Sequence, residues 1–245
     1  MCSSSLYKSL TLILVSFFIL YIKLIHVVLN ISDAIVMNAT PLYALLSVAI
    51  PKTYSNKDLK ELAKGFKKAA KKFDIQIIGG DTISNEKLDI SITIISKTSN
   101  PVLRSGVKKN NLICYTGTLG SCKEDLGKLF KNEVISKKSK FIKPKLNPYF
   151  FYEIAPYITA SMDISDGLFF ELEKLSKSSK IGFEFFNEIS ENIGSSGEEY
   201  EILFSFDEKN LEKINKIAQK HKVELNIFAK AIKGKYRTAC KNHHF

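Results

Sequence analysis

The segment SMDISDG, at residues 161–167, ends an apolar stretch, YITASMD, with two aspartates and a glycine. The pattern predicts a β-strand, then an acidic loop, then a helix over LFFELEKLSKSS. Loop residues at a strand end are well placed for ligands, and Gly167 permits a tight turn or a close approach. Asp163 and Asp166 supply the hard oxygens that Mg²⁺ takes together with substrate phosphates. The alternative is that Ser165 or Asp166 simply caps the helix.

Two further acidic segments repeat this layout. In NISDA (30–34) the Ile-Ser-Asp triplet returns with Asp33 at the start of an expected helix, for which a plain N-cap is the alternative. In IIGGDT (77–82) an apolar strand is expected to end at two glycines and Asp81. Backbone amides beside such glycines can face a phosphate, and an ordinary turn is the alternative.

Arginine is scarce in this chain, and Arg104 lies in a glycine-marked loop, LRSGV. Such an arginine suits a phosphate, although a surface arginine explains it equally well. Several carboxylates with one arginine fit metal-assisted phosphoryl transfer. The segment GSCKEDLGKL is not a P-loop, because Cys122 and Leu129 stand where that motif needs glycine and serine or threonine.

The composition indicates a folded chain of one large unit or two small domains, with 245 residues and 45% hydrophobic side chains. The formal net charge of +11 comes almost entirely from lysines scattered along helical stretches. With no zinc-finger spacing and no arginine-rich run, nucleic-acid binding is not expected. The cysteines form no CxxC pair, and Cys114 lies in a strand-like run, which favours a reduced, cytoplasmic protein.

Strand and helix patterns alternate in both halves, which predicts an α/β or α+β chain. Residues 32–50 are expected to be helical with an interruption near Pro41, and NKDLKELAKGFKKAAKKF forms an amphipathic helix. The prolines and lysines of IKPKLNPYF (142–150) indicate a domain boundary.

The N-terminus is unusually apolar. Residues 9–29 would just span a bilayer as one helix if Lys23 extends towards the membrane surface. A buried helix or strand pair, and a non-native N-terminus, are the alternatives. Contact with a membrane is therefore expected only if this segment is a native anchor.

The ordered set NISDAIVMNATP, IIGGDT, RSGV, YTGTLG, SMDISDGL and SGEEYEILF resembles the bacterial thiamine-monophosphate kinase family. That family belongs to the aminoimidazole-ribonucleotide-synthetase-like ATP-binding superfamily, and the resemblance covers roughly residues 28–245. GEEYE replaces the usual GEDYE. The resemblance implies a two-domain PurM-like α/β fold, with an ATP- and Mg²⁺-binding domain at 29–142 and a C-terminal domain at 143–245.

The resemblance also implies a reaction and a site. The reaction is direct in-line phosphoryl transfer from ATP to thiamine monophosphate, giving thiamine diphosphate, with no protein nucleophile. A homodimer formed through a barrel-like sheet is expected. The implied Mg²⁺ ligands are Asp33, Asp81, Asp163 and Asp166. The implied nucleotide contacts are Gly80, Asp81, Arg104 and Ser165, and Glu198 is the implied thiamine contact.

Residues 1–28 depart from the family pattern, because they contain no aspartate, glutamate or glycine where relatives carry a Gly-Asp-Asp loop. A frameshifted or mis-started reading frame is the hypothesis for this segment, and impaired catalysis is its expected consequence. Two alternatives to the kinase remain open. One is another superfamily enzyme, such as a selenophosphate synthetase or a hydrogenase-maturation protein. The other is a catalytically inactive, nucleotide-binding or membrane-tethered remnant.

Overall fold

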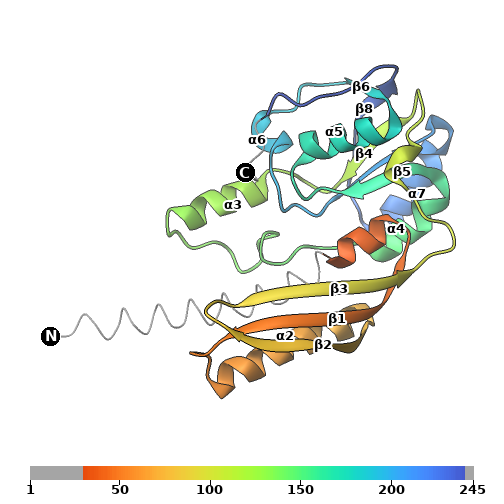
Figure 1. Ribbon diagram of the computed structural model, residues 1–245. Helices are drawn as coiled ribbons and strands as arrows, with labels where there is room; N and C mark the ends of the chain where they lie inside the picture. Colours follow the sequence, from red (N-terminus) through yellow and green to blue (C-terminus); the bar gives the residue numbers. More distant parts are fainter. Residues whose placement is uncertain (1–29, 241–245) are drawn as a thin grey trace. The chain divides into compact units, whose positions relative to one another are not determined.

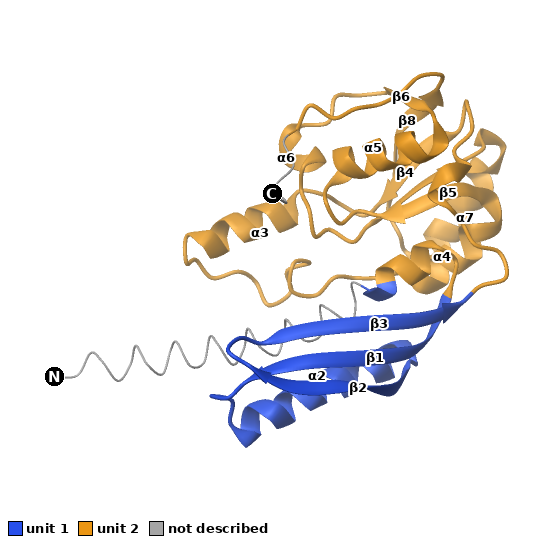
Figure 2. Cartoon of the chain, in the orientation of Figure 1, with its two compact units in different colours: residues 1–31, 40–97 blue, residues 32–39, 98–245 orange. Residues whose placement is uncertain are grey.

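The computed structural model describes residues 30–240 (Figure 1). They fall into two compact units, coloured separately in Figure 2. Unit 1 includes Thr40–Lys97, and unit 2 comprises Ser32–Ala39 and Thr98–Phe245. The expected atypical segment 1–28 and the possible anchor 9–29 lie outside the described residues. Across residues 30–240, no helix combines the length and apolar character needed to cross a bilayer.

Unit 1 is a three-stranded sheet with one long helix. Its elements are β1 (Thr40–Pro51), α2 (Asn56–Phe73), β2 (Gln76–Asn85) and β3 (Asp89–Lys97), and the sheet order is β2-β1-β3. The predicted amphipathic helix is confirmed as α2, which buries Leu62, Phe66 and Ala69. A capping box formed by Ser55 and Asp58 begins this helix, since each side chain bonds to the other residue's backbone N–H.

The helix predicted over 32–50 is only half correct. Residues 30–36 are helical, but Thr40–Pro51 is the central strand β1. A continuous apolar run has no clear period, so its sequence suits a buried strand and a helix equally well. Pro41 is tolerated because the pairing of β1 with β3 shifts register between Pro41 and Tyr43, where no ladder bond is needed.

The glycines of IIGGDT lie within β2, so the prediction that the strand ends there is wrong. The parallel register with β1 slips by one residue at Ile78, between the pairs Ala44–Ile77 and Leu45–Gly79. Gly80 follows with φ of 140°, and a Cβ there would lie 1.8 Å from the Leu46 carbonyl oxygen. Gly80 is therefore required for close approach of two strands.

A hollow of about 630 Å³ opens between α2 and the sheet of unit 1. Apolar side chains of β1, β2 and α2 form most of its lining, and Gly80 and Asp81 belong to it as well. The glycine-aspartate pair of unit 1 therefore lies beside an open concave surface.

Unit 2 is built on a five-stranded antiparallel sheet with the order β5-β7-β4-β8-β6. The strands are β4 (Leu112–Thr116), β5 (Ile158–Asp163), β6 (Gly182–Phe185), β7 (Ile202–Phe206) and β8 (Leu225–Ile232). The helices are α3 (Ser121–Phe130), α4 (Pro148–Ile154), α5 (Leu168–Ser179), α6 (Glu191–Gly194) and α7 (Leu211–His221), with short 3₁₀ turns η1 (Arg104–Gly106), η2 (Ala155–Tyr157) and η3 (Glu208–Asn210). The predicted strand, loop and helix around SMDISDG are confirmed as β5 and α5.

The unit boundary differs from the predicted one. The chain passes between the units at Lys97–Thr98, and residues 142–143 lie inside unit 2. The reason is that β4 pairs with both β7 and β8, so the segment before the prolines completes the second sheet. Strand pairing between distant segments leaves no local signal, whereas the prolines only mark a loop.

Candidate functional site

The acidic loop after β5 and the turn before β7 are joined by backbone hydrogen bonds. Ile164 N donates to Glu201 O at 2.9 Å, and Tyr200 N donates to Ile164 O at 2.9 Å. Glu198 N then donates to Ser165 O at 2.7 Å. The structure thus places the predicted thiamine contact, Glu198, beside the predicted nucleotide contact, Ser165.

The helical residues 32–36 pack against the same strand end within unit 2. Ser32 Oγ donates to Asp163 Oδ2 at 2.5 Å, and Ser161 Oγ donates to the Val36 carbonyl oxygen. Asp33 lies inside this helix, so the alternative that it is an N-cap is wrong. The two Ile-Ser-Asp triplets, whose aspartates Asp33 and Asp166 are 133 residues apart in the sequence, therefore contribute to one site in unit 2.

Two carboxylates of this site are disfavoured as anions. Burial raises the pKa of Asp163 to about 6, the Ser32 hydroxyl partly opposes this, and the charge of Asp33 adds to it. Burial also raises the pKa of Asp33, against the lowering effects of Arg104 and Lys174. Mutually repelling, partly desolvated carboxylates are expected where a cation binds.

Glu171 and Lys174 of α5 fix the acidic loop through hydrogen bonds and an ion pair. Glu171 Oε1 accepts hydrogen bonds from Ser165 Oγ at 3.2 Å, from Asp166 N at 3.0 Å and from Lys174 Nζ at 3.0 Å. Lys174 Nζ also reaches Asp166 Oδ2 at 2.5 Å. Helix α5 has Gly167 as N-cap with no side-chain cap, so the alternative that Ser165 or Asp166 caps it is wrong.

The remaining basic residue of the site is Arg104, in the 3₁₀ turn η1. Its side chain is exposed, which agrees with both a phosphate-binding arginine and an ordinary surface arginine. Its positive charge lowers the pKa of Asp33, whereas burial raises it. The turn is fixed to its surroundings through the backbone, since Ser179 Oγ donates to the Arg104 carbonyl at 2.7 Å. A guanidinium held close to carboxylates is suited to a phosphate oxygen.

The turn that carries Glu198 has a strained backbone. Glu198 and Tyr200 adopt φ values of 60° and 51°, in the left-handed region that glycine favours. Such a conformation costs roughly 1–2 kcal/mol for each non-glycine residue. Tyr200 Oη donates to Glu198 Oε2 at 2.7 Å, which orients the Glu198 carboxylate. Strain of this kind is concentrated at functional sites.

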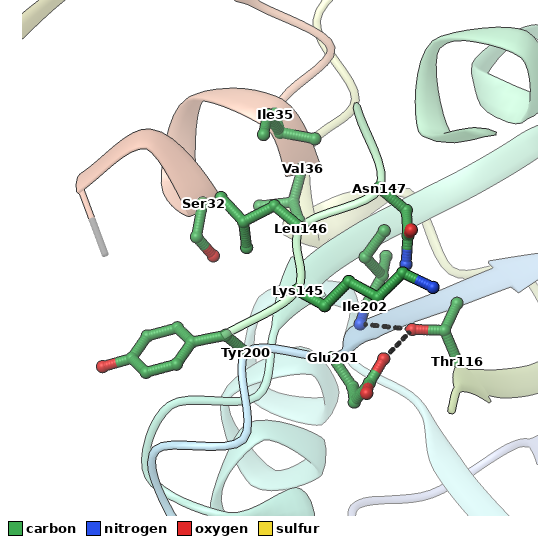
Figure 3. A pocket seen from close by; sticks show the side chains of 10 residues that line it. All are labelled: Ser32, Ile35, Val36, Thr116, Lys145, Leu146, Asn147, Tyr200, Glu201 and Ile202. Atoms are coloured by element: carbon green, nitrogen blue, oxygen red, sulfur yellow. Dashed lines mark hydrogen bonds between the residues drawn. The ribbon is translucent and has the colours of Figure 1, made fainter. Parts of the chain in front are cut away.

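A polar cluster behind this turn was not identified from the sequence. Thr116 Oγ1 donates to Glu201 Oε2 at 2.6 Å and accepts from Ile202 N at 3.0 Å (Figure 3). Lys140 Nζ lies 2.9 Å from Glu201 Oε1. The second and third acids of GEEYE were the available signal, whereas nothing in the sequence around Lys140 predicts its partners.

The cavity drawn in Figure 3 lies beside this cluster, between the helix at 30–36, the segment 145–147 and the start of β7. Its volume is about 10 Å³. That is room for about one water molecule, which excludes it as a substrate site.

Residues 30–240 contain no group of three or more His, Cys, Asp and Glu side chains that could hold a metal by themselves. The available oxygens nonetheless fit Mg²⁺, which usually takes one or two carboxylates and completes its shell with water and substrate phosphates. Asp163, with its raised pKa, and Asp33 are the pair whose charges a cation would compensate.

The last two predicted residues, Gly80 and Asp81, belong to unit 1. The Asp81 side chain is exposed and its Oδ1 accepts from Thr82 N at 2.7 Å. In the pairing with β1, Asp81 stands opposite Ser47. The structure therefore brings Asp33, Arg104, Asp163, Ser165, Asp166 and Glu198 into unit 2 and leaves Gly80 and Asp81 on the sheet of unit 1.

The chain is similar to known proteins in both sequence and structure. The model of the N-terminal domain of AIR synthase related proteins matches residues 24–98, which end at the boundary of unit 1. Among solved structures, AaThiL complexed with AMPPCP and TMP is 20% identical, with a TM-score of 0.81 over 93% of this chain and 81% of that chain. A hydrogenase maturation protein, HypE, in complex with ATP has a TM-score of 0.73 at 13% identity, over 86% and 71%. These likenesses confirm the predicted two-domain fold.

The sequence relatives distinguish between the enzymes that share this fold. The thiamine-monophosphate kinase of Nitrosopumilus maritimus is 31% identical over 79% of this chain and 68% of its own length. That of Buchnera aphidicola subsp. Schizaphis graminum is 32% identical over 80% and 68%. The kinase of Pyrococcus horikoshii is 31% identical over 77% of this chain and 66% of its own. The chain thus matches about two thirds of the length of these relatives, and it belongs to the thiamine-monophosphate kinase family.

Proposed function

We propose that this chain transfers the γ-phosphoryl group of ATP to thiamine monophosphate, as a cytoplasmic Mg²⁺-dependent phosphotransferase. The observation that carries the proposal is the joining of the acidic loop to the GEEYE turn, through the hydrogen bonds of Ile164, Glu198 and Tyr200. It sets a candidate acceptor contact next to candidate phosphate contacts. The AaThiL structure contains AMPPCP and TMP, and the likeness to it supports a site that takes both a nucleotide and an acceptor.

Asp33, Asp163 and Asp166 of unit 2 and Asp81 of unit 1 are the proposed Mg²⁺ ligands. When bound, Mg²⁺ neutralises phosphate charge and aligns the attacking and leaving oxygens. The rest of the chemistry is positioning by the protein. Ser165 and Gly80 are proposed to meet the nucleotide phosphates, and Arg104 is proposed to balance their charge. No protein nucleophile is required for direct transfer.

Glu198 is proposed to hold the thiamine moiety. Its carboxylate carries a fixed hydrogen bond from Tyr200, which leaves its second oxygen to meet a cationic or hydrogen-bond-donating ring. The hydrogen bond from Tyr200 to this carboxylate and the backbone bond from Glu198 N to Ser165 O orient it before substrate arrives. A preorganised contact of this type lowers the entropic cost of binding.

The first test is turnover. With ATP and Mg²⁺ the chain should form thiamine diphosphate, at a rate reduced by the atypical segment 1–28, and a chelator should abolish the reaction. Glu198→Gln should raise the KM for thiamine monophosphate at least tenfold, while the KM for ATP changes less than twofold. Glu191→Gln, on the exposed start of α6, is the matched control and should behave as the unsubstituted chain. Nucleotide binding without any turnover would instead support the inactive remnant.

A homodimer through unit 1 is also proposed. By strand register, Tyr43, Leu45, Ile83 and Ile95 share one face of the sheet, opposite the face that carries buried Ala44 and Val48. All four are exposed, with Ile83 at 58% and Ile95 at 42% of their full exposure. An uncovered apolar sheet face of this kind marks an interface.

The dimer is tested by light scattering coupled to size exclusion. The unsubstituted chain should have twice the monomer mass, and Ile95→Asp should shift it to monomer at micromolar concentration, because a charge would be buried in the interface. Leu126→Asp, on exposed helix α3 of unit 2, is the control and should remain dimeric. Monomeric behaviour of the unsubstituted chain at high concentration would refute the dimer.

A further inference from the structure

A buried ionic pair lies directly behind the turn that carries Glu198. The Glu199 side chain is fully buried. Its Oε1 accepts from Gly120 N at 2.7 Å, Cys122 N at 3.2 Å and Ser196 Oγ at 2.6 Å. Its Oε2 lies 2.9 Å from Lys140 Nζ. Both oxygens of a buried carboxylate are therefore satisfied by three separate segments of unit 2.

Lys140 connects these segments through one ammonium group. Besides Glu199, it pairs with Glu201 Oε1 at 2.9 Å and donates to the Thr118 carbonyl oxygen. Lys140 lies in a connection between α3 and α4 that contains no helix or strand, yet only 17% of its side chain is exposed. A buried ion pair is a weak source of stability, and its best-supported benefit is to select one conformation.

The conformation that this ion pair would select is the turn at residues 198–200, which has a left-handed backbone. Glu198 and Tyr200, the immediate neighbours of Glu199 on either side, are the residues with positive φ. Non-glycine residues stay in that region only when the surroundings hold them there. Glu199 is the inward-facing anchor between them, and its bonds to the start of α3 fix the middle of the turn against the body of unit 2.

We infer that Lys140 and Glu199 are positioning residues, which hold the turn at 198–200 in its left-handed form and thereby fix the Glu198 carboxylate for the acceptor substrate. This inference rests on the proposed function. Lys140 and Glu199 act through Glu198, because the charged groups of both residues are already paired with other protein groups. The inference divides the roles within the GEEYE motif. Its first acid, Glu198, contacts the substrate, and its second acid, Glu199, orients that contact.

Hydrogen exchange tests the positioning directly. In the full chain, Glu199→Gln and Lys140→Met should each speed exchange of the Glu198 and Tyr200 amides at least tenfold, because these amides depend on the turn for their bonds to Ser165 O and Ile164 O. Exchange of core β4 amides should stay unchanged, which separates loosening of the turn from unfolding. Lys138→Met, exposed on the same connection, should change neither.

Binding tests the consequence. By calorimetry, Glu199→Gln and Lys140→Met should weaken thiamine monophosphate at least tenfold and change the affinity for a non-hydrolysable ATP analogue less than twofold. The double variant should be no weaker than either single one, because the pair acts as a unit. Lys140→Arg should restore most of the affinity. A merely structural role would weaken both ligands together.

The outcomes are separable. If the unsubstituted chain binds thiamine monophosphate and the variants bind it equally well, or if the two turn amides keep their exchange rates, the positioning role is overturned while the proposed function stands. If the unsubstituted chain binds no thiamine monophosphate, the proposed function falls and the positioning of Glu198 for that substrate falls with it.

Discussion

Asp163→Asn should make the protein more stable and inactive at the same time. In Mg²⁺-free buffer at pH 8, the substitution removes a charge that folding buries, while the isosteric amide can still accept the Ser32 hydroxyl bond. The rise of the Asp163 pKa from 3.8 to about 6 corresponds to about 3 kcal/mol in the free energy of unfolding. That figure is the upper end of the expected gain.

The pH dependence of this gain has a definite sign. The pKa of Asp163 is higher in the folded state, so its contribution to stability is fully present below about pH 4 and is lost as the pH rises through about 6. The variant should therefore match the unsubstituted protein near pH 4 and exceed it at pH 8. Urea titrations followed by circular dichroism at the two pH values measure the difference.

Activity should move in the opposite direction. Because Asp163 is a proposed Mg²⁺ ligand, Asp163→Asn should lower kcat at least a hundredfold. Added Mg²⁺ should stabilise the unsubstituted protein more than the variant. Asp207→Asn is the matched control. The Asp207 pKa is lowered, chiefly by the Lys209 backbone N–H, so this exposed substitution should slightly destabilise and leave turnover intact. Equal loss of stability at both pH values, or retained activity, in Asp163→Asn would contradict the assignment.

Gly106→Ala should destabilise unit 2 by about 3 kcal/mol. A Cβ at Gly106 would lie 1.8 Å from the Thr159 carbonyl oxygen, in the strand that ends at Asp163. Because that oxygen is backbone, either the turn η1 or strand β5 must shift, and forced overpacking commonly costs 1–3 kcal/mol or more. Displacement of η1 also moves Arg104, so the KM for ATP should rise.

Gly127→Ala provides a matched glycine substitution in the same unit. Nothing lies within 4 Å of a Cβ at Gly127, in the interior of helix α3. Alanine there should stabilise the helix by about 0.5–1 kcal/mol and leave both KM values unchanged. Denaturant titrations should therefore separate the two variants by about 4 kcal/mol. Similar midpoints for both would show that η1 does not depend on close contact with β5.

Local sequence patterns were sufficient for several elements. The helical spacing of α2, the apolar run of β5 and the glycine before α5 each act over a few residues, so their sequences specify them directly. Local patterns were insufficient where strand pairing overrides the conformational propensity of the residues. Strand β1 was mistaken for helix, and the glycines of β2 were mistaken for a strand end, because only neighbouring strands reveal the register.

By itself, the sequence determined the family, the order of the acidic motifs and the residue types that carry the proposed chemistry. Only the tertiary structure decided that Asp33 and Asp163 repel one another, that Glu198 meets Ser165 and that Lys140 closes the GEEYE turn. The physical reason is separation along the chain. Ser32 and Asp163 are 131 residues apart and Lys140 and Glu199 are 59 apart, so no periodicity links them until the sheet of unit 2 brings them together.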